Sequence, residues 1–310
     1  MTEERRFLII TALLPEGGLT GASLIERDAS VWSADDGRVR INGAFVCCAD
    51  GGYAWARAAG IMPDAVVGDM DSLAPELLRE LEDTGIATER HPREKDDTDT
   101  LLCVKYGLAR GFSKFTILGG VGGEFAHTLA NLQALSFLTD MECEAEILTG
   151  RERVFMLDGG TVKAGRPGAP PAADSAAQAA QSAQTAQAGP APQAARLTPQ
   201  SAQMEPALQA ARLTPQSAQM ELALQAARHE VLLTGAPGQR FSVFSYAERT
   251  SRVTLEGAVK YPLADAVLTQ SYPIGLHNEF TAKAADGLAA GQARLRIGFG
   301  RVLVVVENRI

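Results

Sequence analysis

The first 142 residues alternate between short apolar runs and segments in which apolar residues recur at helical spacing. Short apolar runs bounded by glycine or polar residues are typical of buried strands, whereas a period of about 3.6 residues is typical of helices. The pattern predicts strands at 7–13, 44–49, 65–67 and 114–118, and helices at 53–59, 75–84, 98–109 and 127–139. Alternating strands and helices are typical of a mostly parallel sheet covered by helices. We therefore expect an α/β domain over residues 1–142.

From about residue 143 the pattern changes to short segments rich in Val, Leu and Phe, separated by turn residues. It predicts strands at 145–149, 153–157, 240–246, 251–256, 293–297 and 301–307. Many short strands without intervening helices are typical of a sandwich or barrel. We expect residues 143–310 to form a small β-sandwich domain. The polar, glycine-rich segment 17–42 is predicted to be a loop or a hairpin.

Residues 167–228 interrupt this second domain with a stretch dominated by Ala, Gln, Pro and Ser. The sequence Q-A-A-R-L-T-P-Q-S-A-Q-M-E at 193–205 recurs at 209–221, which indicates a tandem duplication. Two copies broken by proline are too few for a solenoid. The composition favours a disordered insertion, and a short amphipathic helix that docks on a partner is the alternative.

The net charge is -8 and the isoelectric point is near 5.2. Nucleic-acid and membrane-surface proteins present a basic face, so this balance argues against both kinds of partner. The apolar run near the N-terminus follows two glutamates and precedes no small-residue cleavage site, which favours a first strand over a signal peptide. No other stretch approaches the length of a membrane span. We expect a cytoplasmic protein.

The four cysteines form no C-x-x-C pair and have no zinc-site spacing. Cys47 and Cys48 are adjacent in a predicted strand, so their side chains point to opposite faces of the sheet. We interpret them as small buried hydrophobic residues.

Acidic residues gather at two places in the α/β region. In V-G-D-M-D-S, Asp69 and Asp71 are two residues apart, and on an extended backbone they would point the same way and repel each other. In K-D-D-T-D-T, Asp96, Asp97 and Asp99 lie at the start of the helix predicted from residue 98. Acidic residues at a helix start are often caps. Carboxylates from several loops also suit Mg²⁺, whose remaining positions are taken by water and substrate phosphates. The two clusters together indicate a metal site.

Two glycine clusters follow predicted strands, where open α/β sheets bind their ligands. The first is C-A-D-G-G, which contains Asp50, Gly51 and Gly52. The second, called the glycine loop below, contains Gly119, Gly120, Gly122 and Gly123 and precedes a helix. Such a loop is a natural cradle for phosphate, although it matches neither the Walker A nor the G-x-G-x-x-G pattern. His127 and Asn131 follow it on one helical face, and a structural role for this histidine stays open beside a functional one.

Taken in order, C-A-D-G-G, V-G-D-M-D-S, K-D-D-T-D-T and G-G-x-x-x-H-x-x-x-N resemble the motifs of the thiamine pyrophosphokinase family. Near the C-terminus, G-A-V-K-Y-P-L and G-L-H-N-E-F are similar to the family's G-x-K-Y-P-L and G-x-S-N-E-F. The resemblance covers the chain except residues 17–42 and the insertion. It implies an ATP-binding α/β domain, a β-sandwich domain that helps to bind thiamine, and a homodimer in which both subunits contribute to the thiamine cleft. The implied reaction transfers a pyrophosphoryl group from ATP to the thiamine hydroxyl, giving thiamine diphosphate and AMP.

The resemblance also implies roles for single residues. Asp69, Asp71 and Asp99 would bind Mg²⁺, with Asp71 or Asp99 as a possible proton acceptor. Asp50 and Asp96 would shape the same site. The glycine loop, with His127 and Asn131 behind it, would approach the ATP phosphates, and His277, Asn278 and Glu279 would lie near thiamine.

The sequence departs from the family pattern at three positions. The family's G-G-R-x-D-H is here G-G-E-F-A-H, so Glu124 replaces an arginine and Ala126 an aspartate, and His277 replaces the serine of S-N-E-F. These changes affect how phosphates and the thiamine ring would be held. They leave two alternatives open: a homologue that binds thiamine or its diphosphate without turnover, or another Mg²⁺-dependent phosphotransferase or phosphatase.

Overall fold

The structure, a computed structural model, describes residues 5–13, 32–35, 38–41, 43–93, 97–159, 229–272 and 274–307, with 32–35 and 38–41 described by their backbone only. The predicted insertion at 167–228 and Asp96 lie outside the described residues. All the described residues belong to one compact unit. Among the described residues, no helix is long and apolar enough to cross a membrane.

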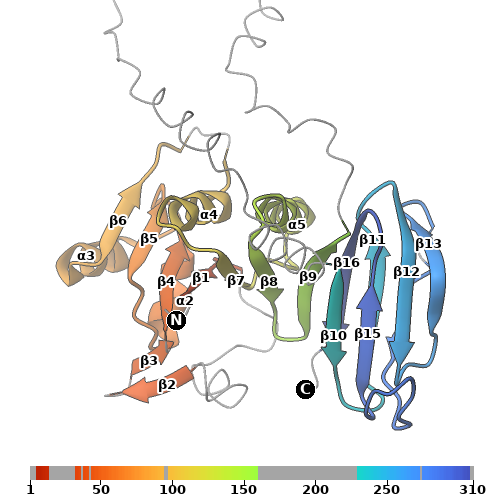
Figure 1. Cartoon of the computed structure of the whole chain (residues 1–310). Helices are drawn as coiled ribbons and strands as arrows, with labels where there is room; N and C mark the ends of the chain where they lie inside the picture. Colours follow the sequence, from red (N-terminus) through yellow and green to blue (C-terminus); the bar gives the residue numbers. More distant parts are fainter. Residues whose placement is uncertain are drawn as a thin grey trace, which may run out of the picture. The chain divides into compact units, whose positions relative to one another are not determined.

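A ten-stranded sheet forms the centre of this unit, in the order β14-β11-β16-β9-β8-β7-β1-β4-β5-β6 (Figure 1). Neighbouring strands from β8 to β6 are parallel. These six strands are β1 (Arg6–Ile10), β4 (Ala44–Ala49), β5 (Ala65–Gly68), β6 (Ala87–Arg90), β7 (Lys114–Leu118) and β8 (Glu144–Leu148). After β1 the chain adds β4, β5 and β6 on one side and then returns to place β7 on the other. The strand order therefore reverses at β1, which creates the switch point where such sheets bind ligands.

Successive residues of a strand point to opposite faces of the sheet, and in these parallel strands both sets are largely apolar. Helices therefore cover both faces. Helices α2 (Gly52–Ala58) and α3 (Pro75–Thr84) pack on the face that includes Cys48. Helices α4 (Asp99–Ala109) and α5 (Phe125–Asp140) pack on the face that includes Cys47. Burial raises the pKa of the Cys48 thiol well above its usual value, and the neighbouring Cys47 adds to this shift. The prediction that both cysteines act as buried hydrophobic residues is confirmed.

The other four strands of the large sheet are antiparallel: β9 (Glu152–Asp158), β11 (Arg240–Ser245), β14 (Asn278–Glu279) and β16 (Arg301–Glu307). A separate antiparallel sheet contains β10 (Glu230–Thr234), β12 (Arg249–Gly257), β13 (Leu263–Thr269) and β15 (Gln292–Arg296), in the order β10-β15-β12-β13. Side chains of both sheets form one apolar core, including Phe241, Val253 and Leu295. This arrangement is a β-sandwich. The predicted fold class, α/β followed by a β-sandwich, is confirmed.

Two details differ from the sequence-based prediction. The first strand ends at Ile10, because Thr11 turns away from the strand pattern and its hydroxyl bonds to Leu118 O at 3.0 Å. Strands β6, β10, β13 and β14 were not predicted. Within 17–42, β2 (Trp32–Asp35) and β3 (Arg38–Ile41) pair as an antiparallel hairpin, which is one of the two forms predicted for this segment. The large sheet runs from β7 through β8 to β9 without a break, so the domain limit at residue 142 stays a prediction.

Arg301 connects the sandwich to α5. Its guanidinium, with a side chain only 9% exposed, lies 2.7 Å from Asp158 in β9 and 2.7 Å from Asp140 at the end of α5. It also donates to the hydroxyl of Ser136 at 2.6 Å. A buried guanidinium needs such partners, since burying an unpaired charge is strongly unfavourable. This cluster fixes the helix that begins at the glycine loop against the antiparallel strands.

Deleting residues 167–228 is expected to leave the fold intact, because the described residues on the two sides of this segment meet at one place. Gly159 N donates to Gly300 O at 2.8 Å, and Ile297 N donates to His229 O at 2.9 Å, so both sides contact the β15–β16 connection. A short link is therefore enough to join them. Thermal unfolding of the deletion variant and the full chain checks this; a loss of cooperative unfolding contradicts it.

Candidate functional site

Three clusters predicted from the sequence lie at the carboxyl ends of neighbouring parallel strands. Asp50 follows β4, Asp69 and Asp71 follow β5, and the glycine loop follows β7 (Figure 1). The strands β4 and β7 flank β1, where the strand order reverses. The topology therefore brings segments that are far apart in the sequence to one edge of the sheet.

The carboxylates of Asp50, Asp69 and Asp71 converge. One oxygen of each lies within 4.8 Å of the other two. Asp50 is buried, Asp69 is half-buried and Asp71 is exposed, so the cluster extends from the sheet edge to solvent. Three negative charges at this distance repel one another, and a cation between them would relieve that repulsion.

The backbone of the β5 loop is shaped so that this convergence is possible. Gly68 has a φ of +155°, and a Cβ there would lie 2.7 Å from Asp50 Cβ, so only glycine lets the two loops approach. Met70, between the two aspartates, adopts a left-handed φ of +64°. The amide of Asp71 donates to Asp69 Oδ1 at 3.2 Å, which closes an Asx turn. The aspartates thus converge through a turn and not through the extended backbone assumed from the sequence.

The surroundings of Asp50 favour a cation at this site. Its Oδ1 atom is buried and has no hydrogen-bond partner among the described residues. The residue also has a left-handed φ of +42°, a conformation that costs free energy and is concentrated at functional sites. Oxygen-only ligands from three carboxylates fit a hard divalent cation such as Mg²⁺. The residues present therefore fit the predicted metal.

The described residues of the second acidic cluster, around the start of α4, make different contacts. Thr98, not an aspartate, caps α4 by accepting a hydrogen bond from Leu101 N at 3.2 Å. Asp97 pairs with Lys105 further along the same helix. Asp99 lies in the first turn of α4 and is not in the group of three carboxylates within 4.8 Å. Its assignment as a metal ligand stays a prediction.

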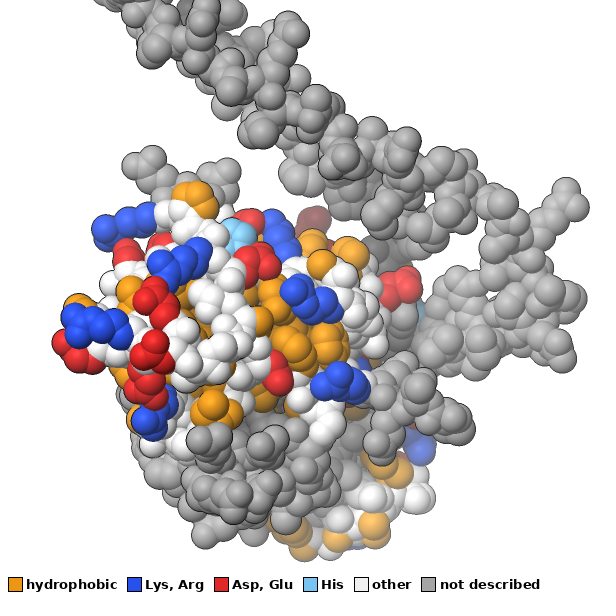
Figure 2. Space-filling view, turned by 90° about the vertical axis from the view of Figure 1, so that its left-hand side faces the viewer, with side chains coloured by type: hydrophobic (Ala, Val, Ile, Leu, Met, Phe, Trp, Pro, Cys, Tyr) orange, Lys and Arg blue, Asp and Glu red, His pale blue; other side chains and the backbone are white. Residues whose placement is uncertain are grey.

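Sequence reasoning missed one residue of this site. Arg93 Nε lies 3.0 Å from Asp71 Oδ2, and the arginine side chain is 82% exposed. Nothing in H-P-R-E-K distinguished this arginine from others on the surface. Figure 2 shows that Lys, Arg, Asp and Glu side chains are mixed on the face that forms the left-hand side of Figure 1. Arg90 of β6 and Glu82 of α3 form an ion pair at 2.7 Å.

The glycine loop is held by side chains of α5. Asn131 is buried and its Nδ2 donates to Gly120 O at 2.8 Å. The hydroxyl of Thr128 bonds to both the amide and the carbonyl of Gly122, at 3.0 and 3.2 Å. Gly119 has a φ of +82°, and a Cβ there would lie 2.2 Å from Leu13 O. The loop is therefore a fixed turn beside the end of β1, and Asn131 serves to position it.

The start of α5 is open to solvent. Glu124 and His127 are both exposed and lie 3.5 Å apart, between Glu124 Oε2 and His127 Nε2. Phe125, between them, is 72% exposed. Glu124 therefore places a carboxylate at the end of the glycine loop, where a helix N-terminus favours negative charge.

A hollow of about 280 Å³ lies next to the glycine loop. Val121, Thr128 and Leu132 form one side of it, and Ser242, Leu276 and His277 belong to another side. Glu152 and Glu307 add two carboxylates to its lining. Ligand pockets have volumes from about 300 Å³ upward, so this hollow lies just below the lower end of that range, and it has the mixed lining of a small-molecule site.

The C-terminal motif residues divide into two kinds. His277 lines the hollow, has a left-handed φ of +56°, and its amide donates to Ser242 Oγ at 3.0 Å. Asn278 is buried; its Oδ1 accepts from Tyr261 N at 3.1 Å and its Nδ2 donates to Tyr261 O at 2.7 Å. Asn278 thus joins the K-Y-P-L and H-N-E-F segments. Glu279 lies 3.4 Å from Lys260. A contact between any of the three and a ligand stays a prediction.

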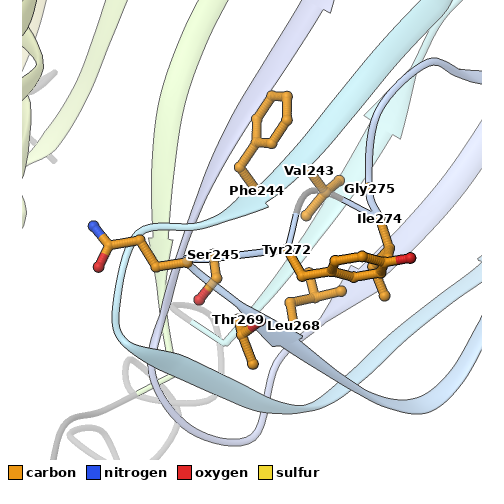
Figure 3. Close-up of a pocket in the computed structure, with 9 residues that line it drawn as sticks. Val243, Phe244, Ser245, Leu268, Thr269, Tyr272, Ile274 and Gly275 are labelled. Carbon is orange, nitrogen blue, oxygen red and sulfur yellow. The ribbon is translucent and has the colours of Figure 1, made fainter.

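A second hollow lies between β11 and β13 (Figure 3). Its volume is about 30 Å³, and Val243, Leu268 and Tyr272 are among its lining residues. That is enough for water and too small for a substrate.

Comparison with known protein families gives a match within the α/β part of the chain. Residues 38–147 match the family model of the thiamin pyrophosphokinase catalytic domain. Over this range the chain is similar to the thiamin pyrophosphokinase family. The matched range contains all three clustered aspartates and the glycine loop, so the family signal and the geometry coincide.

Two curated proteins are similar to a part of this chain. Thiamine pyrophosphokinase of Bacillus subtilis (strain 168) is 35% identical over 77 residues, which is 25% of this chain and 36% of that protein. Thiamine pyrophosphokinase 1 of Oryza sativa subsp. japonica is 30% identical over 79 residues, 24% of this chain and 30% of that protein. The matched segments thus span about a third of these relatives.

Solved structures extend the similarity of fold over the whole chain. The crystal structure of thiamine pyrophosphokinase from Bacillus subtilis superposes with a TM-score of 0.61 at 14% identity, covering 99% of this chain and 100% of that one. Thiamin pyrophosphokinase from Candida albicans gives a TM-score of 0.58 at 11% identity, covering 99% of this chain and 90% of that one. At these identities the comparison supports the fold alone.

Proposed function

We propose that this protein is an ATP:thiamine pyrophosphotransferase that forms thiamine diphosphate and AMP. The observation that carries this proposal is the convergence of Asp50, Asp69 and Asp71 within 4.8 Å, with a buried Asp50 oxygen that has no described partner. This cluster lies in the range that matches the thiamin pyrophosphokinase catalytic domain. It therefore supplies carboxylate ligands for the metal ion that would neutralise the charge of a triphosphate.

The chain's own residues would act mainly by positioning. Asp69 and Asp71, with Asp50 beside them, would hold Mg²⁺, and Asp99 is a further proposed ligand. When bound, Mg²⁺ neutralises charge on the transferring phosphates. The glycine loop, held by Asn131 and Thr128, would approach the same phosphates.

The proposed step forms one bond and breaks one bond. The thiamine hydroxyl oxygen bonds to the β-phosphorus of ATP, and the bond from that phosphorus to the oxygen bridging to the α-phosphorus breaks. AMP leaves with that oxygen, and the hydroxyl proton passes to a carboxylate, for which Asp71 and Asp99 are the candidates. Such transfers need little covalent help from protein and depend on alignment and charge neutralisation.

We place thiamine in the hollow beside the glycine loop. Its apolar wall suits an aromatic ring, while Glu152 and Glu307 would favour the positive charge of a thiazolium. His277 lines the same hollow at the position where the family has serine. The homodimer and the cytoplasmic location implied by the sequence stay predictions.

A second function, thiamine binding without turnover, is favoured by Glu124. Its exposed carboxylate ends the glycine loop where the family pattern has an arginine, so it would repel a triphosphate. The aspartate cluster favours the enzyme, because a protein that only binds thiamine has no use for three converging carboxylates.

The test gives purified protein ATP, Mg²⁺ and thiamine and quantifies AMP and thiamine diphosphate, while calorimetry measures thiamine binding in parallel. The proposal predicts equal amounts of both products, formed only with Mg²⁺. Thiamine binding without either product establishes the binding function instead. Formation of phosphate from ATP regardless of thiamine indicates another phosphotransferase or phosphatase.

Replacing Glu124 with glutamine is expected to lower the KM for ATP about two- to fivefold, because it removes one exposed negative charge near the phosphates. The effect should shrink in high salt. Glu142→Gln, which removes the same charge beyond the other end of α5, is the control. Equal KM values for the two variants would show that Glu124 does not face the nucleotide.

A further inference from the structure

Arg93 holds one of the carboxylates that the metal would need. Its Nε lies 3.0 Å from Asp71 Oδ2, and Asp71 belongs to the three-carboxylate cluster. A guanidinium and a divalent cation are both positive, so both cannot occupy one carboxylate oxygen without strong repulsion. Binding of a metal at Asp71 would therefore weaken the ion pair between this carboxylate and Arg93.

The ion pair between Arg93 and Asp71 is exposed, so a cation can displace the arginine at a small cost in free energy. The Arg93 side chain is 82% exposed and that of Asp71 is 41% exposed. Exposed ion pairs contribute little to stability, and a divalent cation held by several carboxylates competes well against one guanidinium.

The backbone before Arg93 is anchored to the site, while the Arg93 side chain is exposed. His91 N donates to Gly68 O at 2.9 Å, so the chain two residues before Arg93 is bonded to the residue just before Asp69. Arg93 therefore stays within reach of the carboxylate cluster after it leaves Asp71. Guanidinium groups bind phosphate oxygens well, since their planar donors match two oxygens at once.

We propose that Arg93 is an exchangeable counterion of the metal–nucleotide site. Without metal it pairs with Asp71; with metal and nucleotide bound it pairs with a phosphate oxygen of the nucleotide. This inference rests on the proposed function for the identity of its ligands. Arg93 acts here as a positioning residue that couples metal loading to phosphate binding.

The test measures Mn²⁺ binding by electron paramagnetic resonance, without nucleotide or thiamine, in the full chain and in Arg93→Gln. Loss of the competing cation should tighten Mn²⁺ binding about two- to fivefold. In the same variant the affinity for ATP with saturating Mn²⁺ should fall about three- to tenfold, because one phosphate contact is lost. If Arg93 had only a structural role, its replacement would not raise the affinity for Mn²⁺ and lower the affinity for ATP in the same variant.

Arg90→Gln is the matched control, since Arg90 is in the same segment, carries the same charge and pairs with Glu82 instead. Arg93→Lys keeps the charge, so its Mn²⁺ affinity should stay near that of the unaltered protein while its ATP affinity is intermediate. Mn²⁺ affinities that agree for Arg93→Gln and Arg90→Gln overturn the competition at Asp71. An unchanged ATP affinity in Arg93→Gln overturns the transfer to phosphate.

Failure of this inference is distinguishable from failure of the proposed function. The Mn²⁺ titration needs neither thiamine nor turnover. A protein that shows both affinity changes but forms no thiamine diphosphate keeps the counterion role and loses the proposed reaction. A protein that turns over while Arg93→Gln and Arg90→Gln behave alike loses the counterion role only.

Discussion

Asp71→Asn is expected to lower kcat with thiamine and ATP by more than about 100-fold while the protein stays folded. Loss of a group that merely supports a metal ligand already costs about 10- to 100-fold, and Asp71 is placed as a ligand itself. Asparagine keeps the size of the side chain, and Asp71 is exposed, so the fold should not depend on its charge. The measurement is kcat as a function of Mg²⁺ concentration, with unfolding curves of the same preparations.

Asp83→Asn is the control for this experiment, because Asp83 is an exposed aspartate of α3 and its replacement changes the net charge equally. That variant should retain the activity of the unaltered protein. If Asp71→Asn turns over within a few-fold of Asp83→Asn at every Mg²⁺ concentration, Asp71 is not a metal ligand.

Arg301→Met is expected to lower the free energy of unfolding by about 2–4 kcal/mol, since breaking a buried ion pair leaves a charge without its partner. The Arg301 side chain is 9% exposed and bridges Asp140 and Asp158, of which Asp158 is 22% exposed and would face an apolar side chain in the variant. The exposed Asp140 regains water, which holds the effect below that of a fully buried pair. Urea unfolding at fixed protein concentration measures it.

Arg240→Met provides the comparison. Arg240 is on the adjacent strand of the same sheet, its side chain is 53% exposed, and it pairs with Glu307 at 2.9 Å. Its replacement should change the free energy of unfolding by less than about 1 kcal/mol. Equal destabilisation by the two substitutions would show that the Arg301 cluster does not fix α5 to the sandwich.

The sequence was sufficient to predict the helices and strands with a strong apolar pattern, and insufficient to predict the short or exposed strands. Strand β4 is a continuous apolar run, A-F-V-C-C-A, and β7 is mostly apolar, K-F-T-I-L, because both faces of each strand are covered by helices. Strand β6 is exposed along its whole length, with the sequence A-T-E-R, and so has no apolar signal. Strand β13 pairs with β12 through irregular register, which disturbs the alternation expected of a half-buried strand.

The same limit applies to the site. The aspartates and glycines were predictable because strand ends meet at one edge of a parallel sheet. The role of Asn278 was not, because its partner Tyr261 is far from it in sequence and the bond is to backbone atoms that any residue would supply. Arg93 was missed for a related reason: an exposed arginine gains its meaning only from the carboxylate that it faces.

The most direct test of the proposed reaction follows the label from ATP that carries ³²P in its γ-phosphate. With Mg²⁺ and thiamine present, transfer of a pyrophosphoryl group predicts label in the terminal phosphate of thiamine diphosphate and an equal amount of unlabelled AMP. Label that appears in inorganic phosphate or in thiamine monophosphate, with ADP as the other product, would contradict it.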